Sequence, residues 1–321
     1  MAHSTPERVL VAGAGALGSV FGGFLARAGL DVTLLGRAPL MAAIERGGLT
    51  VTGLWGTHHV DRLRVATDAA HLAGPFDTIL LCVKSWDTLP VMRALAPLLA
   101  VDGLAVSVQN GLGNVEALAA AVGPERAAGA RVIFGAEVTA PGRVAVTVYA
   151  APVLIGTLDG TATPAQRARI DGLVAALGRT PIPTESTPRL LPALWAKVLY
   201  NAALNPLGAL LGVPYGELAD SPHTRAVMDR VVAEALQVAR AIPVGLPWDT
   251  AADYLQVFYG ELVPATARHR SSMLQDLERG RPTEVDAING QVVAAGTRLG
   301  IPTPVNAALA DMIRFRAGRP G

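Results

Sequence analysis

Three polar side chains, Lys197, Asn201 and Asn205, recur at every fourth position of an otherwise almost wholly apolar segment. If the segment is a helix, they lie within about 80° of one another on a single stripe. An ammonium group so placed can stabilise a developing negative charge and deliver a proton. Burying these groups without partners would be costly, so we expect the stripe to face a ligand in a polar cleft. A buried hydrogen-bond network is the alternative.

A glycine pattern near the amino terminus indicates a second site. The apolar run 9–12 precedes a G-x-G-x-x-G turn at Gly13, Gly15 and Gly18, and helix and strand patterns follow. This order is the context of a dinucleotide-binding turn. Gly13 would allow the tight turn, Gly15 would let the backbone approach a pyrophosphate, and Gly18 would let helix and strand pack closely. The helix start would attract phosphate. A tight turn in another α/β fold is the alternative.

The end of the second predicted strand, 32–35, indicates which dinucleotide is bound. NAD sites usually place an acid beyond this strand, whereas NADP sites tend to have an arginine nearby. Asp31 precedes the predicted strand, and Arg37 follows it. Because an arginine fork pairs well with phosphate, the sequence favours NADP(H) over NAD(H). The alternative for Arg37 is a solvated loop cation.

Two further polar residues end apolar strand runs. Lys84 closes the run I-L-L-C-V-K, and Asn110 follows the run 104–108. The carboxyl ends of strands in a doubly wound sheet face the ligand crevice, so both side chains are placed to meet cofactor or substrate. A strand-end lysine in water and an Asn-Gly turn are the alternatives.

The last cluster lies in residues 271–289. Thr283 and Asp286 have the spacing of a capping box, which predicts a helix over 283–299 with Glu284 as its first residue. Glu284 there would also complement the helix dipole without any other role. Ser272 could be a hydroxyl group on an ordinary helix.

Length and composition limit the class of protein. The chain has 321 residues, 51% of them hydrophobic and 17% charged, which suggests about two domains with a sizeable core. The net charge of +1 argues against a nucleic-acid or anionic-membrane surface. One cysteine, Cys82, excludes an internal disulfide and a cysteine-based metal cluster, and we expect it to be buried. We identify no metal-ligand motif.

Targeting signals are not recognised either. The segment 1–8 is short and polar, unlike a signal peptide. No apolar run approaches the ~18 residues of a membrane span. We therefore expect a cytoplasmic protein. Its oligomeric state, monomer or homodimer, does not follow from the sequence.

The order of patterns predicts two domains. Up to about residue 187, apolar strands alternate with helices, which indicates a parallel sheet covered on both faces. After it, helical periodicity dominates. We therefore predict a Rossmann-type α/β domain, a doubly wound parallel sheet at 1–187, followed by an all-α domain at 188–321, with 180–188 as the link. The predicted strands are 9–12, 32–35, 49–52, 78–83, 104–108, 129–138, 143–149 and 153–156. The predicted helices are 17–28, 39–46, 88–99, 114–121, 164–177, 190–210, 224–241, 250–261, 283–299 and 304–316.

Over nearly its full length the chain resembles the ketopantoate reductases, the 2-dehydropantoate 2-reductase family. The resemblance lies in G-A-G-A-L-G with the arginine after the second strand, V-K, Q-N-G-L-G, W-A-K-V-L-Y-N-A-A-L-N-P, S-S-M-L-Q-D and R-P-T-E-V-D-A-I-N-G. It implies a Rossmann domain followed by a helical domain. It also implies reduction of ketopantoate to pantoate, on the route to pantothenate and coenzyme A.

The resemblance also implies a role for each residue. Lys197 would be the general acid, a role that a lysine can fill if partial burial lowers its pKa towards the operating pH. Glu284 would orient substrate or cofactor. The substrate, a small 2-oxo acid, would be held by Asn110, Asn201, Asn205 and Ser272. The cofactor NADP(H) would be held by Gly13, Gly15, Ala16, Leu17, Gly18, Arg37, Lys84, Asn110 and Glu284.

Other functions remain compatible with the sequence. The same scaffold could reduce another 2-oxo acid, since residues 241–270 give no indication of the substrate's side chain. A β-hydroxyacid or 6-phosphogluconate-type dehydrogenase would have a similar pair of domains. A non-catalytic NADP-binding sensor is a further alternative, against which the intact set of Lys197, Asn201 and Glu284 argues.

Overall fold

The computed structural model describes residues 7–318, which form two compact units. The first unit holds the described residues up to Gln109 together with Asn114–Leu190. The second holds Asn110–Gly113 and the described residues from Leu191 onward. The predicted boundary after residue 187 and the roles of the two domains stay predictions. Residues 1–6, part of the segment that we expect to carry no signal peptide, lie outside the described residues.

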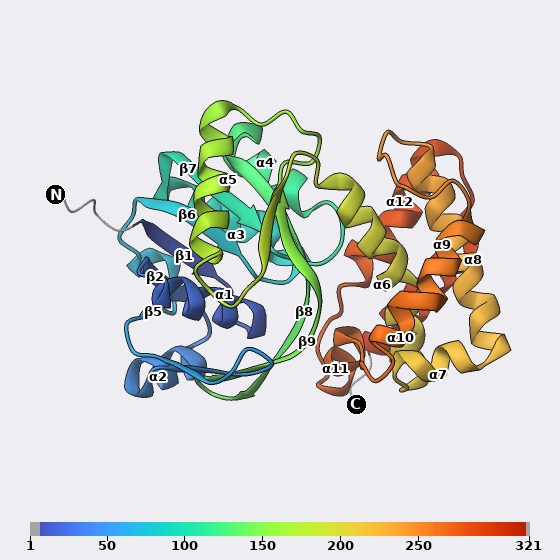
Figure 1. Ribbon diagram of the computed structural model, residues 1–321, viewed down its shortest axis with the longest axis horizontal. Coiled ribbons are helices and arrows are strands. Elements are labelled where there is room, and N and C mark those ends of the chain that lie inside the picture. Colours follow the sequence, from blue (N-terminus) through green and yellow to red (C-terminus); the bar gives the residue numbers. More distant parts are fainter. Residues whose placement is uncertain (1–6, 319–321) are drawn as a thin grey trace. The chain divides into compact units, whose positions relative to one another are not determined.

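In the first unit, strands and helices alternate along most of the chain (Figure 1). Its strands are β1 (Arg8–Ala12), β2 (Asp31–Leu35), β3 (Leu49–Gly53), β4 (His58–Val60), β5 (Arg64–Ala66), β6 (Phe76–Leu81), β7 (Leu99–Ser107), β8 (Ala127–Ala140), β9 (Arg143–Gly156) and β10 (Thr184–Thr187). Its helices are α1 (Ala16–Arg27), α2 (Ala38–Gly47), α3 (Thr88–Leu95), α4 (Asn114–Val122) and α5 (Pro164–Leu177). Short 3₁₀ turns cover Ala69–His71, Ser85–Asp87, Ala96–Leu98 and Pro124–Arg126.

The strands described in this unit form one ten-stranded sheet. Their order is β4-β3-β9-β8-β7-β6-β1-β2-β5, and β10 pairs with β9. The strands from β5 to β8 in this order pair in parallel, whereas β9 runs antiparallel to β8. The predicted Rossmann-type sheet is confirmed, and β8 and β9 form an antiparallel hairpin.

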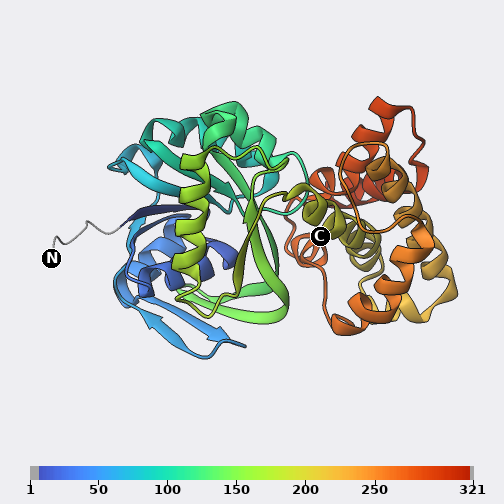
Figure 2. The ribbon, with the colours of Figure 1, turned by 45° about the horizontal axis from the view of Figure 1, so that its top comes forward.

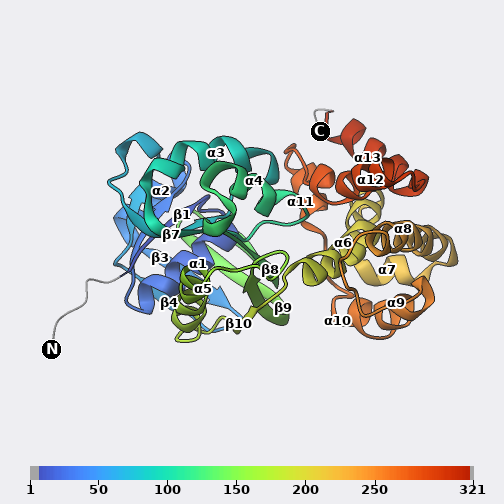
Figure 3. The same cartoon turned by 90° about the horizontal axis from the view of Figure 1, so that it is seen from above.

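Helices cover both faces of the sheet because the side chains of each strand alternate. In β1, Val9 and Val11 pack in one core cluster with Phe21 of α1. Leu10 of the same strand packs in another cluster, with Met92 of α3. Figure 3 shows α1 and α5 on one side of the strands and α3 and α4 on the other. The sheet is therefore buried on both faces, as parallel sheets usually are.

The regular secondary structure described in the second unit is helical, and its helices are coloured yellow to red in Figure 2. Its helices are α6 (Leu191–Leu211), α7 (Tyr215–Asp220), α8 (Pro222–Arg240), α9 (Ala251–Val257), α10 (Val263–Ala265), α11 (Ser272–Glu278), α12 (Asn289–Leu299) and α13 (Pro304–Ala317). A π-helical turn at Phe258–Leu262 joins α9 to α10, and a 3₁₀ turn at Val285–Ala287 precedes α12. The long helix α6 packs against α8, α11 and α13. None of the helices within residues 7–318 has the length and apolarity needed to cross a membrane.

Prolines account for two differences between the predicted and observed elements. The helix predicted over 88–99 ends at Leu95, because Pro97 belongs to a 3₁₀ turn and Leu99 already begins β7. The strands predicted at 143–149 and 153–156 form one continuous strand, β9. Pro152 lies there beside register irregularities in the pairing with β8, where a missing N–H is tolerated.

A third difference is that the predicted link, 180–188, contains the edge strand β10. Its sequence, T-E-S-T, has no large apolar residue, and its side chains are half-buried or exposed. Parallel pairing with β9 decides its conformation, and a local hydrophobic pattern could not have shown it.

The close packing of the first turn predicts a difference between two glycine variants. A Cβ atom on Gly18 would lie 2.2 Å from the Gly13 carbonyl oxygen, whereas one on Gly15 would meet nothing within 4 Å. We expect Gly18→Ala to lower the free energy of unfolding by about 1–3 kcal/mol or more. The matched control Gly15→Ala should change it by less than about 1 kcal/mol. Denaturant unfolding measures both, and equal effects would contradict this account of the turn.

Candidate active site

The three glycines of the first turn have different surroundings. Gly13 has a φ of 99°, a conformation that favours glycine, and its amide donates to the Leu35 carbonyl at 2.9 Å. Gly18 touches the Gly13 carbonyl so closely that any side chain would clash. Gly15, by contrast, is exposed and borders open space. The first and third glycines therefore shape the turn, and the second leaves the backbone accessible to a ligand.

Helix α1 begins directly at this turn. The Ser19 amide donates to the Gly15 carbonyl at 2.9 Å, so the amides of Ala16, Leu17 and Gly18 precede the helical hydrogen-bond ladder. No acidic side chain occupies the first turn of the helix. Free amides and the positive end of the helix dipole suit a phosphate group. The residues predicted to contact the pyrophosphate thus fit an anionic ligand.

The carboxyl end of β2 carries an arginine and no acid. Arg37 is exposed at the N-cap position of α2. Asp31 is the first residue of β2, at the opposite end of the strand, and forms ion pairs with Arg8 at 3.7 Å and Arg64 at 3.0 Å. Asp31 is therefore engaged by protein cations at the amino end of the sheet, and Arg37 is the charged group that follows the carboxyl end.

The loops after β6 and β7 are joined by a buried polar network that the sequence analysis did not identify. Gln109 Nε2 donates to the Val83 carbonyl at 2.9 Å and to Thr88 Oγ1 at 2.8 Å. Thr88 Oγ1 in turn lies 3.0 Å from Asn114 Oδ1. Half-buried Lys84 directly follows Val83. The only sequence signal for this network was a glutamine at the end of an apolar run.

In the second unit, three of the predicted residues meet in one hydrogen-bonded chain. Lys197 Nζ donates to Asn110 Oδ1 at 2.6 Å, and Asn110 Nδ2 donates to Glu284 Oε2 at 3.3 Å. Glu284 is buried, whereas Lys197 and Asn110 are half-buried. A cation and a carboxylate from distant parts of the sequence thus bind the two ends of one carboxamide, whose orientation they determine.

The segment that carries Asn110 is held tightly against the residues that follow Glu284. The Leu112 amide donates to the Ala287 carbonyl at 2.9 Å. Gly111 has a φ of 87°, and a Cβ atom there would lie 2.2 Å from the Ala287 oxygen. Only glycine fits this approach, so Gly111 is required for Asn110 to reach its two partners.

The other polar residues of the α6 stripe differ in their partners. Asn201 is 8% exposed, and its side chain makes no hydrogen bond with any other residue in the described range. Asn205 Oδ1 accepts a hydrogen bond from Tyr215 Oη at 2.6 Å. Burial raises the pKa of the Tyr215 phenol, so this group stays a donor. Asn205 is thus part of an internal network, one of the two alternatives for the stripe, with its amide nitrogen directed away from Tyr215.

The two adjacent serines at the start of α11 have different environments. Ser271 is fully buried, and its Oγ accepts from the Leu274 amide at 3.0 Å as the N-cap of the helix. The same hydroxyl donates to the Asn205 carbonyl at 3.3 Å. Ser272, the residue predicted to bind substrate, is exposed as the first residue of α11. The buried cap role of Ser271 had no distinct signal in the sequence.

The helix predicted over 283–299 is wrong at its start. Val285–Ala287 forms a 3₁₀ turn, and α12 begins at Asn289. The Glu284 side chain instead bonds to Asn110, and Asp286 accepts hydrogen bonds from Arg314. These tertiary partners outweigh the local capping pattern, and they leave Glu284 outside the helix.

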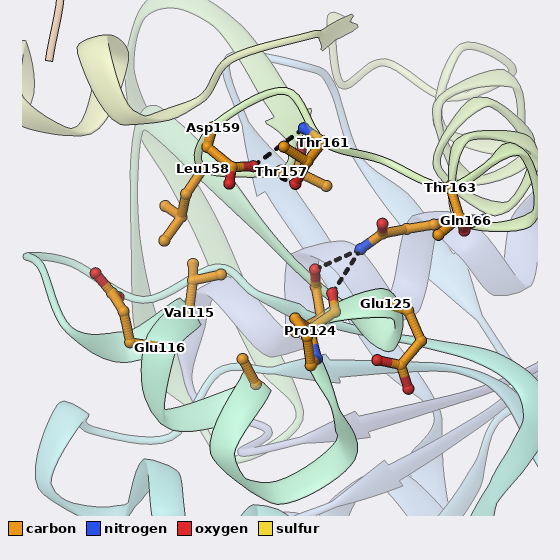
Figure 4. Close-up of a pocket in the computed structure, with 12 residues that line it drawn as sticks. Val115, Glu116, Pro124, Glu125, Thr157, Leu158, Asp159, Thr161, Thr163 and Gln166 are labelled. Carbon is orange, nitrogen blue, oxygen red and sulfur yellow. Dashed lines mark hydrogen bonds between the residues drawn. The ribbon is translucent and has the colours of Figure 1, made fainter. Parts of the chain in front are cut away.

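A cavity of about 290 Å³ also lies in the first unit, beside α4 and the start of α5 (Figure 4). The exposed carboxylates of Glu116, Glu125 and Asp159 border it, and these would repel an anionic ligand. It is lined by Val115, Glu116, Ala119, Pro124, Glu125, Ala127, Thr157, Leu158, Asp159, Thr161, Thr163 and Gln166. None of the predicted site residues is among them.

Both parts of the chain match known families. Residues 9–160 match the family model described as "Ketopantoate reductase PanE/ApbA", and residues 189–317 match "Ketopantoate reductase PanE/ApbA C terminal". The chain belongs to the ketopantoate reductase family. It is accordingly an oxidoreductase of the class that acts on CH–OH groups.

Individual relatives agree with this assignment. The chain is 34% identical over 309 residues to 2-dehydropantoate 2-reductase of Aquifex aeolicus, covering 96% of both chains. It is 34% identical to a crystal structure of a PanE/ApbA family ketopantoate reductase from Ralstonia eutropha JMP134, with a TM-score of 0.85 and coverage of 97% and 98%. A ternary structure of D-mandelate dehydrogenase with NADH and anilino(oxo)acetate has a TM-score of 0.86 over 97% and 98% of the chains. Its identity of 22% limits that likeness to the fold.

The environment of Cys82 predicts a thiol of low reactivity. Cys82 is half-buried, less than expected from the sequence, and lies beneath the glycine turn, where its Cβ would be 3.2 Å from a Cβ atom on Gly18. Burial raises the pKa of the Cys82 thiol, so the reactive thiolate is scarce at neutral pH and becomes commoner as pH rises. We expect the folded protein to react with a disulfide reagent at least about tenfold more slowly than the unfolded chain. Equal labelling rates would contradict this.

Proposed function

We propose that the protein reduces 2-dehydropantoate to pantoate with NADPH, a step of pantothenate and coenzyme A biosynthesis. The observation that carries this proposal is the hydrogen-bonded set of Lys197, Asn110 and Glu284 in a member of the ketopantoate reductase family. In this proposal the first unit is the NADP-binding domain, and the second unit is the substrate and catalytic domain.

The first unit suits NADP(H) in shape and in charge. The open backbone at Gly15 and the amides of Ala16, Leu17 and Gly18 would hold the pyrophosphate. Gly13 would shape the turn. When bound, NADPH supplies the hydride.

The region around the adenosine 2′-phosphate would be held by two cations. Arg37 follows the carboxyl end of β2, and Lys84 follows β6. Their charge suits a phosphate, and Asp31, which pairs with Arg8 and Arg64, lies at the opposite end of β2. We infer from this a preference for NADP(H) over NAD(H).

Composition supports the choice of Lys197 as the general acid. Lys84 and Lys197 are the lysines of the sequence, and the other members of its 27 basic residues are all arginines. An arginine does not release a proton near neutral pH, but a lysine can. Lys197 is therefore one of only two Lys or Arg side chains in the sequence that can give a proton to the ketone oxygen as it gains negative charge.

Asn110 and Glu284 would hold that acid in place. The Asn110 oxygen fixes the Lys197 ammonium group, and the Glu284 carboxylate fixes the Asn110 amide. In the proposed reaction, Asn110 also lies near the nicotinamide ribose, and Glu284 orients substrate or cofactor through hydrogen bonds.

The substrate's carboxylate and hydroxyl groups would be bound by Asn201, Asn205 and Ser272. Asn201 has a buried carboxamide with no partner in the described residues, which a ligand would satisfy. Tyr215 occupies the Asn205 oxygen, so Asn205 would offer its N–H groups to an anion. The exposed Ser272 hydroxyl would add a further donor.

Reduction of another 2-oxo acid is the second candidate. It is favoured by the likeness in fold to D-mandelate dehydrogenase, solved with NADH and anilino(oxo)acetate. Comparing kcat/KM for ketopantoate and for a panel of aliphatic and aromatic 2-oxo acids, at fixed NADPH, discriminates between the two candidates.

The role of Lys197 predicts a large loss of turnover. We expect Lys197→Ala to lower kcat with ketopantoate by about 10²–10⁴-fold, because general acid catalysis contributes factors of this size. NADPH consumption measures the rate, and fluorescence titration measures NADPH affinity, which should stay unchanged. Lys197→Arg is the matched control, since it keeps the charge but donates a proton poorly.

Activity of Lys197→Arg near that of the wild type would contradict the acid role and leave only charge stabilisation. Absence of turnover in the wild type with all 2-oxo acids, despite NADPH binding, would contradict the enzymatic proposal and favour a sensor.

The position of Arg37 predicts a loss of cofactor discrimination. We expect Arg37→Ala to weaken NADPH binding by about 10–100-fold, as expected for a charged hydrogen bond, and to change NADH binding little. Arg46→Ala is the control, because Arg46 is an exposed arginine in the last turn of the same helix, α2. Equal losses of NADPH and NADH affinity would refute the phosphate contact.

A further inference from the structure

The helix that carries the proposed acid contains a proline. Pro206 lies inside α6, one residue after Asn205. Because proline has no N–H group, it cannot donate to the carbonyl four residues earlier, which belongs to Ala202. Ala202 is fully buried, so water cannot supply the missing donor. An unsatisfied buried carbonyl at this point would be costly.

Asn289 supplies that donor from another helix. Its Nδ2 atom donates to the Ala202 carbonyl at 3.1 Å and to Asn306 Oδ1 at 3.1 Å. Asn289 is fully buried as the first residue of α12. The proline in α6 and the asparagine in α12 are thus complementary, because one removes a hydrogen bond that the other replaces.

The orientation of the Asn289 amide is determined by a chain of partners. Asn306 Nδ2 donates to the Val231 carbonyl at 3.2 Å and to Glu234 Oε2 at 2.8 Å, so its oxygen faces Asn289. The Glu234 carboxylate also accepts from the amides of Val305 and Asn306 at the start of α13. This arrangement is favourable at a helix N-terminus, and it holds Asn289 so that its nitrogen faces α6.

Stability alone does not account for this asparagine. Asn289 Oδ1 is buried and has no hydrogen-bond partner among the described residues. Such an orphaned oxygen is destabilising. The Asn289 side chain is therefore destabilising at Oδ1, whereas its Nδ2 makes a directed contact with one carbonyl of α6.

This contact completes a ring of interactions around the proposed acid. Lys197 of α6 binds Asn110, Asn110 binds Glu284, and Glu284 is followed by the short turn that leads to Asn289. Asn289 then returns to α6 at Ala202, between Lys197 and the proline. We propose that Asn289 is a positioning residue, which sets the Glu284 segment against α6 by bonding the carbonyl that Pro206 frees. This inference rests on the proposed function.

The test is a double-mutant cycle. We expect Asn289→Leu to lower Tm by about 2–6 °C and kcat by about 10–100-fold. Pro206→Ala restores an N–H donor within α6. We therefore expect Asn289→Leu to lower the Tm of the Pro206→Ala variant by no more than half of the amount by which it lowers the Tm of the wild type. Thr297→Val is the control, since it removes a hydrogen bond at 2.9 Å from the exposed face of α12.

Each arm of this cycle can overturn the proposal. An additive loss of Tm in the double variant would show that Asn289 does not act through the Ala202 carbonyl. A lower Tm with unchanged kcat in Asn289→Leu would reduce its role to ordinary stability. The Tm measurements need no substrate. A wild type that turns over no 2-oxo acid would therefore contradict the proposed function, while the Tm values would still show whether Asn289 acts through the Ala202 carbonyl.

Discussion

The candidate site in the second unit depends on the 2.6 Å hydrogen bond between Lys197 and Asn110. It joins a helix that begins this unit to a segment that interrupts the sequence of the first unit. The Asn110 carboxamide thus links the proposed acid to the Glu284 carboxylate.

Close backbone packing makes this contact possible. Gly111 lets its segment approach the Ala287 carbonyl within a distance that excludes any side chain. The first unit uses the same device, because Gly18 abuts the Gly13 carbonyl where α1 leaves the sheet. In both places the absence of a Cβ atom lets main-chain segments meet and leaves polar groups in defined positions.

In the interior of the second unit, other helices supply the hydrogen-bond partners of polar groups on α6. Pro206 frees the Ala202 carbonyl, and Asn289 satisfies it from α12. Tyr215 likewise satisfies the Asn205 oxygen from α7. Each buried polar group of α6 is therefore matched by a specific partner or, as at Asn201, left for a ligand in the proposed function.

The sequence by itself determined the alternation of strands and helices, the glycine turn, and the set of residues able to carry chemistry. Those features depend on periodicity, on backbone freedom and on residue type, which act locally. Only the tertiary structure decided that Glu284 lies before a 3₁₀ turn and that β10 joins the sheet. It also decided that Asn289 bonds to α6. Partners distant in the sequence outweigh local preferences at these positions, and no periodicity records which buried carbonyl a given side chain will satisfy.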